Sequence, residues 1–314
     1  MNNLTRKLGI GVLLLGLLLV SACSTEAPGS ADDKEAGDNE KENIKIGLSV
    51  STLNNPFFVT LRDSAESKAE ELGYEIVTAD AQDDPSKQLS DIEDMLQQDI
   101  DVLLVNPTDS DAVVAAVELA NGEEIPVVTV DRSSEGGEVI AHVASDNISG
   151  GEMAGEFIGE KLENEGKVVE LEGVSGSSTS RERGEGFHNI INEIDELEIV
   201  ASQSADFDRT KGLSVMENII QGSGDVDAVF AHNDEMALGA LEALEAKNIL
   251  EDVVVVGFDA TDDAVSSVED GRLDATIAQQ PDLIGESAVD AAGKVANGED
   301  IEDYIPIDLK LVTE

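Results

Sequence analysis

From residue 44 onward, short runs of β-branched and other apolar residues alternate with stretches in which apolar residues recur at helical spacing. This alternation is typical of a parallel sheet whose strands are joined by crossover helices. It predicts ten strands, at residues 44–50, 75–80, 102–106, 127–131, 139–144, 167–171, 199–203, 228–232, 253–258 and 275–278. The pattern therefore predicts an α/β fold, and a chain of 314 residues is long enough for two domains.

One predicted helix is marked at both ends. Asn55 is an N-cap candidate, Pro56 suits the first helical position, and Gly73 suits the C-terminal end. Between them, apolar residues share one helical face: Phe57, Leu61, Ala65, Ala69 and Leu72. A helix over 56–72 is therefore expected directly after the first strand.

The two halves of the body resemble each other. One predicted strand in each half runs into an asparagine, Asn106 and Asn233, and another ends in an aspartate, Asp131 and Asp259. Weak self-similarity at a spacing above one hundred residues indicates two similarly folded domains and not a short-period solenoid.

The first 22 residues have the pattern of an export signal. Arg6 and Lys7 precede an apolar stretch over 8–20 that is too short for an ordinary membrane span. The residues before Cys23 resemble the lipobox of bacterial lipoproteins, in which the cysteine is lipidated and becomes the mature N-terminus. The alternative is an ordinary signal peptide with an incidental cysteine. We expect a lipoprotein signal peptide over 1–22 and an acidic flexible tether over 23–43. As the only cysteine, Cys23 forms no internal disulfide.

The formal net charge of −49 excludes most anionic partners. Phosphate backbones and anionic lipid surfaces would repel such a chain, so nucleic-acid binding is not expected. The tether over 24–43 has seven acids against two lysines, and the leader has two basic residues, so −46 remains on the body. We hypothesise that this acidity reflects a saline habitat.

Polar and aromatic residues collect just past the predicted strands, where ligands bind in open α/β sheets. They are Asn54, Asn55, Phe57, Phe58, Asp131, Arg132, Asp206, Phe207, Asp208, Asn233, Asp234, Phe258, Asp259 and Gln279. Each one alone could be a helix cap, a core residue or a surface ion pair. Together they suit a sugar, because ring C–H faces pack on aromatic rings while hydroxyls need both donors and acceptors.

No catalytic constellation is recognisable. The three histidines, His142, His188 and His232, lack metal-ligand spacing, and the chain has neither a P-loop nor a nucleophile elbow. The glycine- and serine-rich stretch 173–178 is either a tight turn or an anion cradle, and His232 either tunes the pocket or belongs to the core. We therefore expect no enzymatic activity, no metal and no cofactor.

Several stretches of the body carry a specific family resemblance. They are STLNNPFFV (51–59), VNPTDSDAV (105–113), VDR (130–132), ASDN (144–147), RERGEGF (181–187), ADFDR (205–209), NDEMALGAL (233–241), VVGFD (255–259) and TIAQ (276–279). Over about residues 44–314 the chain resembles the ribose-binding members of the bacterial periplasmic binding protein family, sugar-binding type.

The resemblance implies two doubly wound parallel-sheet domains of the type I architecture, joined by a hinge of three crossovers. It places one lobe at 44–145 plus 280–308 and the other at 146–279 plus 309–314. Ligand would close the two lobes like a hinge.

The resemblance also implies the ligand contacts. They fall on Asn55, Phe57, Phe58, Asp131, Arg132, Arg183, Phe207, Asn233, Phe258, Asp259 and Gln279, with the four phenylalanines around the sugar ring. Arg183 comes from the resemblance alone, which also leads us to expect Gln where this chain has His232.

The implied function is that of a monomeric, lipid-anchored, extracytoplasmic receptor that passes D-ribose to an ABC permease and its ATPase. One alternative is a receptor for allose, xylose, galactose or a furanosyl signal. Another is the ligand domain of a LacI-type regulator, which needs a DNA-binding segment that this leader does not resemble. A third is a sugar hydrolase, which needs a catalytic carboxylate pair in the cleft.

Overall fold

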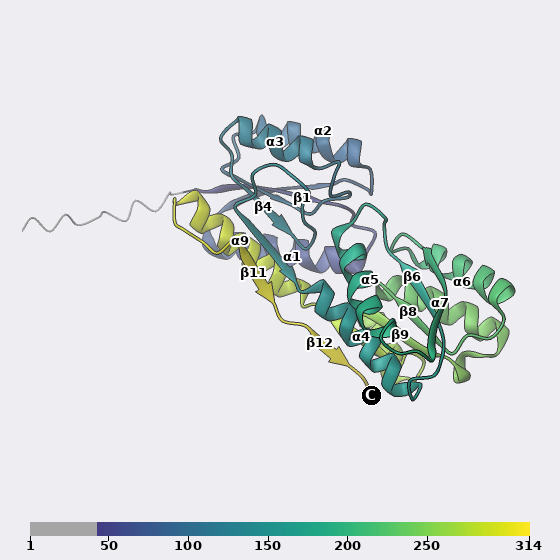
Figure 1. The fold of residues 1–314 in the computed structure, drawn as a ribbon. Coiled ribbons are helices and arrows are strands. Elements are labelled where there is room, and N and C mark those ends of the chain that lie inside the picture. Colours follow the sequence, from purple (N-terminus) through teal and green to yellow (C-terminus); the bar gives the residue numbers. More distant parts are fainter. Residues whose placement is uncertain (1–42) are drawn as a thin grey trace, which may run out of the picture. The chain divides into compact units, whose positions relative to one another are not determined.

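The computed structural model describes residues 43–314, and their strands form two six-stranded sheets (Figure 1). The first sheet has the order β11-β5-β4-β3-β1-β2, and all of its neighbouring strands are parallel. Its strands are β1 (Lys45–Val50), β2 (Glu75–Asp80), β3 (Val102–Val105), β4 (Val127–Val130), β5 (Ala141–Ser145) and β11 (Tyr304–Ile307).

The second sheet repeats this arrangement in the order β12-β10-β9-β8-β6-β7. It is parallel except for the antiparallel pairing of β12 with β10. Its strands are β6 (Gly166–Glu172), β7 (Leu197–Ser204), β8 (Ala228–Ala231), β9 (Val254–Asp259), β10 (Ala275–Ala278) and β12 (Lys310–Val312). The expected architecture of two doubly wound α/β lobes is thus confirmed.

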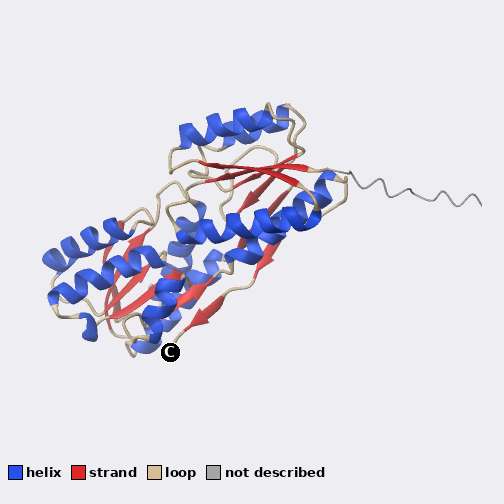
Figure 2. Ribbon diagram, turned by 180° about the vertical axis from the view of Figure 1, so that it is seen from behind, coloured by secondary structure: helices blue, strands red, loops and turns tan. Residues whose placement is uncertain are grey.

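Helices cover both faces of each sheet, as Figure 2 shows. In the first lobe, α1 (Pro56–Leu72) and α9 (Pro281–Ala296) pack on one face, and α2 (Pro85–Leu96) and α3 (Val114–Gly122) pack on the other. In the second lobe, α4 (Asn147–Lys161) and α5 (Ser178–Ile191) cover one face. The other face carries α6 (Arg209–Ser223), α7 (Asp234–Lys247), the 3₁₀ turn η1 (Leu250–Asp252) and α8 (Asp262–Glu269). Each lobe therefore has its own core on both sides of its sheet.

Helix α1 begins and ends where the sequence predicts. The side-chain oxygen of Asn55 accepts a hydrogen bond of 2.9 Å from the backbone N–H of Phe57, and Pro56 is the first helical residue. At the other end, Gly73 adopts a φ of 75°, which glycine reaches without steric cost. These caps fix Phe57 and Phe58 at the carboxyl edge of the first sheet.

The chain passes between the sheets three times: from β5 to α4, from β10 to α9, and from β11 to β12. The last two strands are absent from the sequence prediction, which ends at residue 278. Both are short edge strands of four and three residues, and β11 contains Pro306, so their periodicity is too brief to identify. The ten predicted strands are all present, with ends that differ by at most two residues.

Within residues 43–314, none of the helices combines the length and the hydrophobicity that a membrane crossing requires. The predicted export signal, Cys23 and most of the predicted tether lie outside the described residues.

Candidate functional site

A small cavity lies between the carboxyl ends of the two sheets. Ten of the eleven predicted contact residues line it: Asn55, Phe57, Phe58, Asp131, Arg132, Arg183, Phe207, Asn233, Asp259 and Gln279. Both lobes contribute to the wall.

Two arginine–aspartate pairs supply the charge of the cavity. Arg132 Nε lies 3.8 Å from Asp131 Oδ2, and Arg183 Nη1 lies 3.8 Å from Asp259 Oδ1. These distances exceed those of hydrogen bonds, although all four residues are buried. Ionised groups that are buried and only loosely paired keep capacity to hydrogen-bond a polar ligand.

Amide side chains hold both carboxylates. Asn106 donates to Asp131 Oδ2 over 3.2 Å, and Gln279 donates to Asp259 Oδ1 over 2.7 Å. The remaining oxygen of Gln279, Oε1, has no hydrogen-bond partner in the protein although it is buried, and neither has Arg132 Nε. A buried polar atom without a hydrogen-bond partner costs about 1–3 kcal/mol. A ligand group that both donates and accepts hydrogen bonds could satisfy this donor and this acceptor. A hydroxyl is such a group.

Burial dominates the acid–base properties of these charged groups. It raises the pKa of Asp131, against the opposing effect of Arg132 and Arg183. It also raises the pKa of Asp259 well above the ordinary value, although Arg183 opposes this shift. Burial lowers the pKa of Arg132 and of Arg183, while the aspartates counteract it. Desolvation therefore exceeds the charge pairing, and extra hydrogen bonds from a ligand would stabilise all four ions.

The aromatic rings have two roles. Phe57 and Phe58 meet edge to face, with centroids 5.2 Å apart, and Phe207 completes the aromatic wall from the second lobe. The guanidinium of Arg132 lies 5.1 Å from the Phe58 centroid and 5.3 Å from the Phe207 centroid. One ring from each lobe therefore stabilises the buried charge of Arg132 by a cation–π contact.

Phe258 differs from the expectation. Its fully buried ring does not line the cavity but lies against Arg183, whose guanidinium carbon is 3.9 Å from the ring centroid. It is a support for Arg183, which leaves three phenylalanines to face a ring in the cavity.

Three wall residues adopt strained backbone conformations. Asp131 has a φ of 63°, Phe207 a φ of 58° and Asp259 a φ of 118°. Residues other than glycine rarely adopt these values, which cost about 1–3 kcal/mol each and concentrate at functional sites. Since all three follow or end strands, the strain turns their side chains into the cavity at the sheet edges.

Each of the two asparagines of the wall also caps a helix. The Asn55 oxygen accepts from the N–H of Phe57, and the Asn233 oxygen accepts from the N–H of Met236. Asn233 further donates to the carbonyl of Phe207 over 3.2 Å. The cap and binding interpretations of these residues are therefore compatible, because their amide nitrogens keep N–H groups for a ligand.

Other strand-end candidates do not reach the cavity. Asn54 is exposed, and Asp206 forms an exposed ion pair with Lys211 at 2.8 Å. Asp234 is fully buried beneath the site and accepts from Thr261 N and Thr276 Oγ1, both at 2.7 Å. Asp208 caps helix α6.

Four wall residues lie on helices: Phe57 and Phe58 on α1, and Thr179 and Arg183 on α5. Thr179 and Arg183 both belong to the N-terminal half of α5, and Thr179 is absent from the sequence prediction. The glycine- and serine-rich stretch 173–178 could have indicated these two residues in the sequence. It connects the carboxyl end of β6 to the start of α5, so it places the first turns of α5 at the edge where ligands bind. Its backbone carbonyl at Gly176 accepts from Ser110 N of the first lobe over 2.9 Å, so the stretch forms an inter-lobe turn.

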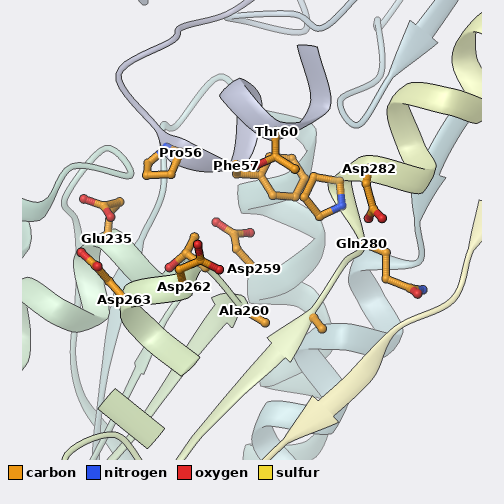
Figure 3. Close-up of a pocket in the computed structure, with 13 residues that line it drawn as sticks. Pro56, Phe57, Thr60, Glu235, Asp259, Ala260, Asp262, Asp263, Gln280 and Asp282 are labelled. Atoms are coloured by element: carbon orange, nitrogen blue, oxygen red, sulfur yellow. The ribbon is translucent and has the colours of Figure 1, made fainter. Parts of the chain in front are cut away.

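A larger pocket adjoins the cavity and shares Phe57 and Asp259 with it (Figure 3). Four further carboxylates line this pocket: Glu235, Asp262, Asp263 and Asp282. All four belong to first turns of helices, where negative charge is favourable. Such an acidic opening disfavours anionic ligands and admits neutral ones. Among residues 43–314, no cluster of histidine, cysteine and acidic residues suits a metal ion.

Residues 46–300 match the family model of the periplasmic binding protein domain. The chain is 54% identical over 303 residues to the ribose import binding protein RbsB of Bacillus subtilis, covering 96% of this chain and 97% of that protein. It is 50% identical over 296 residues to RbsB of Escherichia coli, covering 94% and 97%.

Solved structures with sugars and polyols are also similar. An ABC transporter solute-binding protein of Bacillus halodurans with bound myo-inositol has a TM-score of 0.82 and 37% identity, covering 86% of this chain and 94% of that chain. A periplasmic solute-binding protein of Actinobacillus succinogenes with bound D-allose has a TM-score of 0.81 and 28% identity, covering 86% and 97%.

Proposed function

Because this chain belongs to the periplasmic binding protein family, whose members are extracytoplasmic solute-binding transport proteins, we propose that it captures D-ribose for an ABC-type importer. Two relatives at 50–54% identity over almost the whole chain are ribose import binding proteins. The observation that carries the proposal is the inter-lobe cavity. Its wall holds two loosely paired Arg–Asp pairs, an unmatched donor at Arg132 Nε and an unmatched acceptor at Gln279 Oε1.

In the proposed complex, the sugar hydroxyls hydrogen-bond the four ionised groups and the amides of Asn55, Asn233 and Gln279. Phe57, Phe58 and Phe207 pack on the C–H faces of the ring. Each hydroxyl both donates and accepts, so it satisfies a carboxylate and a guanidinium together. An analogue that lacks one hydroxyl leaves a buried charge without its partner and binds more weakly.

We propose that binding is coupled to closure of the two lobes, with boundaries at 44–145 plus 280–308 and 146–279 plus 309–314. The wall of the cavity is complete only when both lobes meet, because Asp131 and Arg132 come from the first lobe and Arg183 and Asp259 from the second. The closed monomer would then dock on the membrane permease, and an ATPase would drive the release of sugar into it. We propose no catalytic role.

We further propose that Cys23 carries a lipid anchor that holds the protein at the outer face of the cell membrane. The lipobox-like sequence before Cys23 supports this. The Cys23→Ser protein should leave the membrane fraction of cells for the medium. Retention with the membranes would contradict the anchor.

Titration calorimetry with D-ribose, D-allose, D-xylose, D-galactose and L-arabinose tests the ligand assignment. We expect ribose to bind most tightly, and no heat with ribose would overturn the proposal. The second candidate is a receptor for another monosaccharide or polyol, favoured by the similar structures with bound D-allose and myo-inositol. Tightest binding of one of the other sugars would select it.

A further inference from the structure

Arg183 is held in the cavity wall by two hydrogen bonds from its guanidinium group. Nη1 donates to the backbone carbonyl of His232 over 2.5 Å, and Nε donates to Asn147 Oδ1 over 2.9 Å. The carbonyl of His232 precedes Asn233, which itself lines the cavity. The direction of the Arg183 side chain therefore depends on how the backbone at the end of β8 is fixed.

His232 is fixed by a buried carboxylate behind the cavity. Its Nε2 lies 3.0 Å from Oε1 of Glu170, a fully buried residue in the middle of β6. The other ring nitrogen, Nδ1, lies 3.4 Å from the backbone N–H of Gly173, which donates to it. This pattern assigns the proton of a neutral His232 ring to Nε2 and makes it the donor to Glu170.

Glu170 also binds the helix that carries Arg183. His188 of α5 places Nε2 at 2.9 Å from Oε2 of Glu170, and Ser202 of β7 donates to the same oxygen over 2.7 Å. At Gly184, the residue after Arg183, an added Cβ would stand 3.3 Å from Oε1 of Glu170 and 3.4 Å from Cε1 of His232. Helix α5 thus packs directly on the Glu170–His232 pair.

Glu170 is a costly residue at this position if it serves only to fill the core. Burial alone would raise the pKa of Glu170. The hydrogen bonds from His232 and Ser202 and the neighbouring His188 outweigh this effect and bring the pKa below its ordinary value. Well-packed apolar residues usually replace a buried charge network without loss of stability. Glu170 contacts His232 after β8 and His188 on α5, and the position of Arg183 depends on both. A role in positioning Arg183 therefore explains this carboxylate better than core filling does.

We propose that the Glu170–His232 pair is a positioning device that orients Arg183 toward the ligand and thereby sets the sugar affinity of the site. The inference rests on the proposed sugar-binding function. Neither Glu170 nor His232 lines the cavity, so both act through Arg183 and the backbone at residue 232.

Three variants separate positioning from stability. His232→Leu removes the donor to Glu170, and His232→Gln restores a donor of similar length. Ser202→Ala removes a partner of Glu170 that belongs to β7 and not to α5 or β8. For each full-length protein, the dissociation constant for ribose is measured by calorimetry, and the midpoint of urea unfolding is measured without sugar.

We expect His232→Leu to bind ribose about tenfold more weakly, because the hydrogen bond from Arg183 to the carbonyl of residue 232 is then less well oriented. A tenfold change in the dissociation constant corresponds to about 1.4 kcal/mol. His232→Gln should bind within about threefold of the wild type, and Ser202→Ala within about twofold despite a lowered unfolding midpoint. The inference is wrong if His232→Leu binds like the wild type, if His232→Gln is as weak as His232→Leu, or if Ser202→Ala loses as much affinity as His232→Leu.

Wild-type protein that gives no heat with ribose would instead contradict the proposed ligand. The same three variants are then titrated with the sugar of the panel that the wild type binds. This keeps a wrong ligand assignment distinguishable from a wrong positioning role.

Discussion

Asp131 lies between two buried cations and is held in a left-handed backbone conformation, with 3% of its surface exposed. The Asp131→Asn substitution preserves shape and tolerates the φ of 63°, since asparagine adopts this region readily. It removes the nearest of the carboxylates that compensate the charge of Arg132, and it removes an acceptor for a sugar hydroxyl. Removing one partner of a buried charge pair costs about 2–5 kcal/mol, so we expect ribose to bind about 30-fold more weakly or worse.

The matched control is Asp282→Asn, which removes an exposed carboxylate that lines the adjoining pocket but not the cavity. Its ribose affinity should stay within about twofold of the wild type. Calorimetry on both variants makes the comparison. Equal affinity of Asp131→Asn and wild-type protein would refute the role of Asp131.

At the scale of single residues, the sequence predicts those site residues that lie at or just past the end of a strand. Asp131, Asn233, Asp259 and Gln279 could be found in this way, because parallel strands bring their carboxyl ends to one edge. Arg183 was found only through the family resemblance, since its position within α5 has no strand-end signal. The sequence could not predict that Phe207 lines the cavity while Phe258 packs against Arg183. The position of Phe207 depends on its left-handed backbone conformation, which no local sequence pattern indicates.

At the scale of elements, the strands with long apolar runs were predictable, whereas β11 and β12 were not. These two strands occupy sheet edges and depend on pairing with β5 and β10, partners far away in the sequence. The same limit applies to contacts between loops of the two lobes. Ser110 N donates to the Gly176 carbonyl over 2.9 Å, and Ser133 N donates to Ser178 Oγ over 3.0 Å.

Gly176 is the element-scale test of closure. A Cβ at this position would stand 1.9 Å from Oδ2 of Asp109 in the first lobe, and Asp109 is itself held by hydrogen bonds to Asp111 N and Ala112 N. Gly176→Ala should therefore oppose closure and weaken ribose binding by about tenfold, the factor that 1.4 kcal/mol gives. The unfolding midpoint without sugar should change little, because the clash arises only between the lobes.

The double variant Gly176→Ala with Asp109→Ala supplies the control, because it keeps the added Cβ but removes the Asp109 carboxylate that this Cβ meets. Calorimetry should show that it regains most of the affinity lost in Gly176→Ala. Affinity that stays low in the double variant would place the defect inside the turn before α5 and contradict the closure explanation.

For the whole molecule, the charge of the cavity and the charge of the surface are separate matters. The two aspartates and two arginines of the cavity cancel, which suits a neutral sugar. The charge of −46 on the body therefore lies outside the site. A neutral ligand gives no reason for this surplus, and self-repulsion on such a scale destabilises a compact fold in dilute buffer.

We expect sodium chloride to stabilise the fold because it screens this repulsion. The Debye length falls from about 10 Å at 0.1 M salt to about 3 Å at 1 M. The melting temperature at pH 7 should rise by about 4 °C or more across this range, the shift that one to two kcal/mol produces at this size. At pH 4.5, close to the isoelectric point of about 4.1, the same series should give a much smaller rise. A melting temperature at pH 7 that is indifferent to salt would contradict an adaptation to saline surroundings.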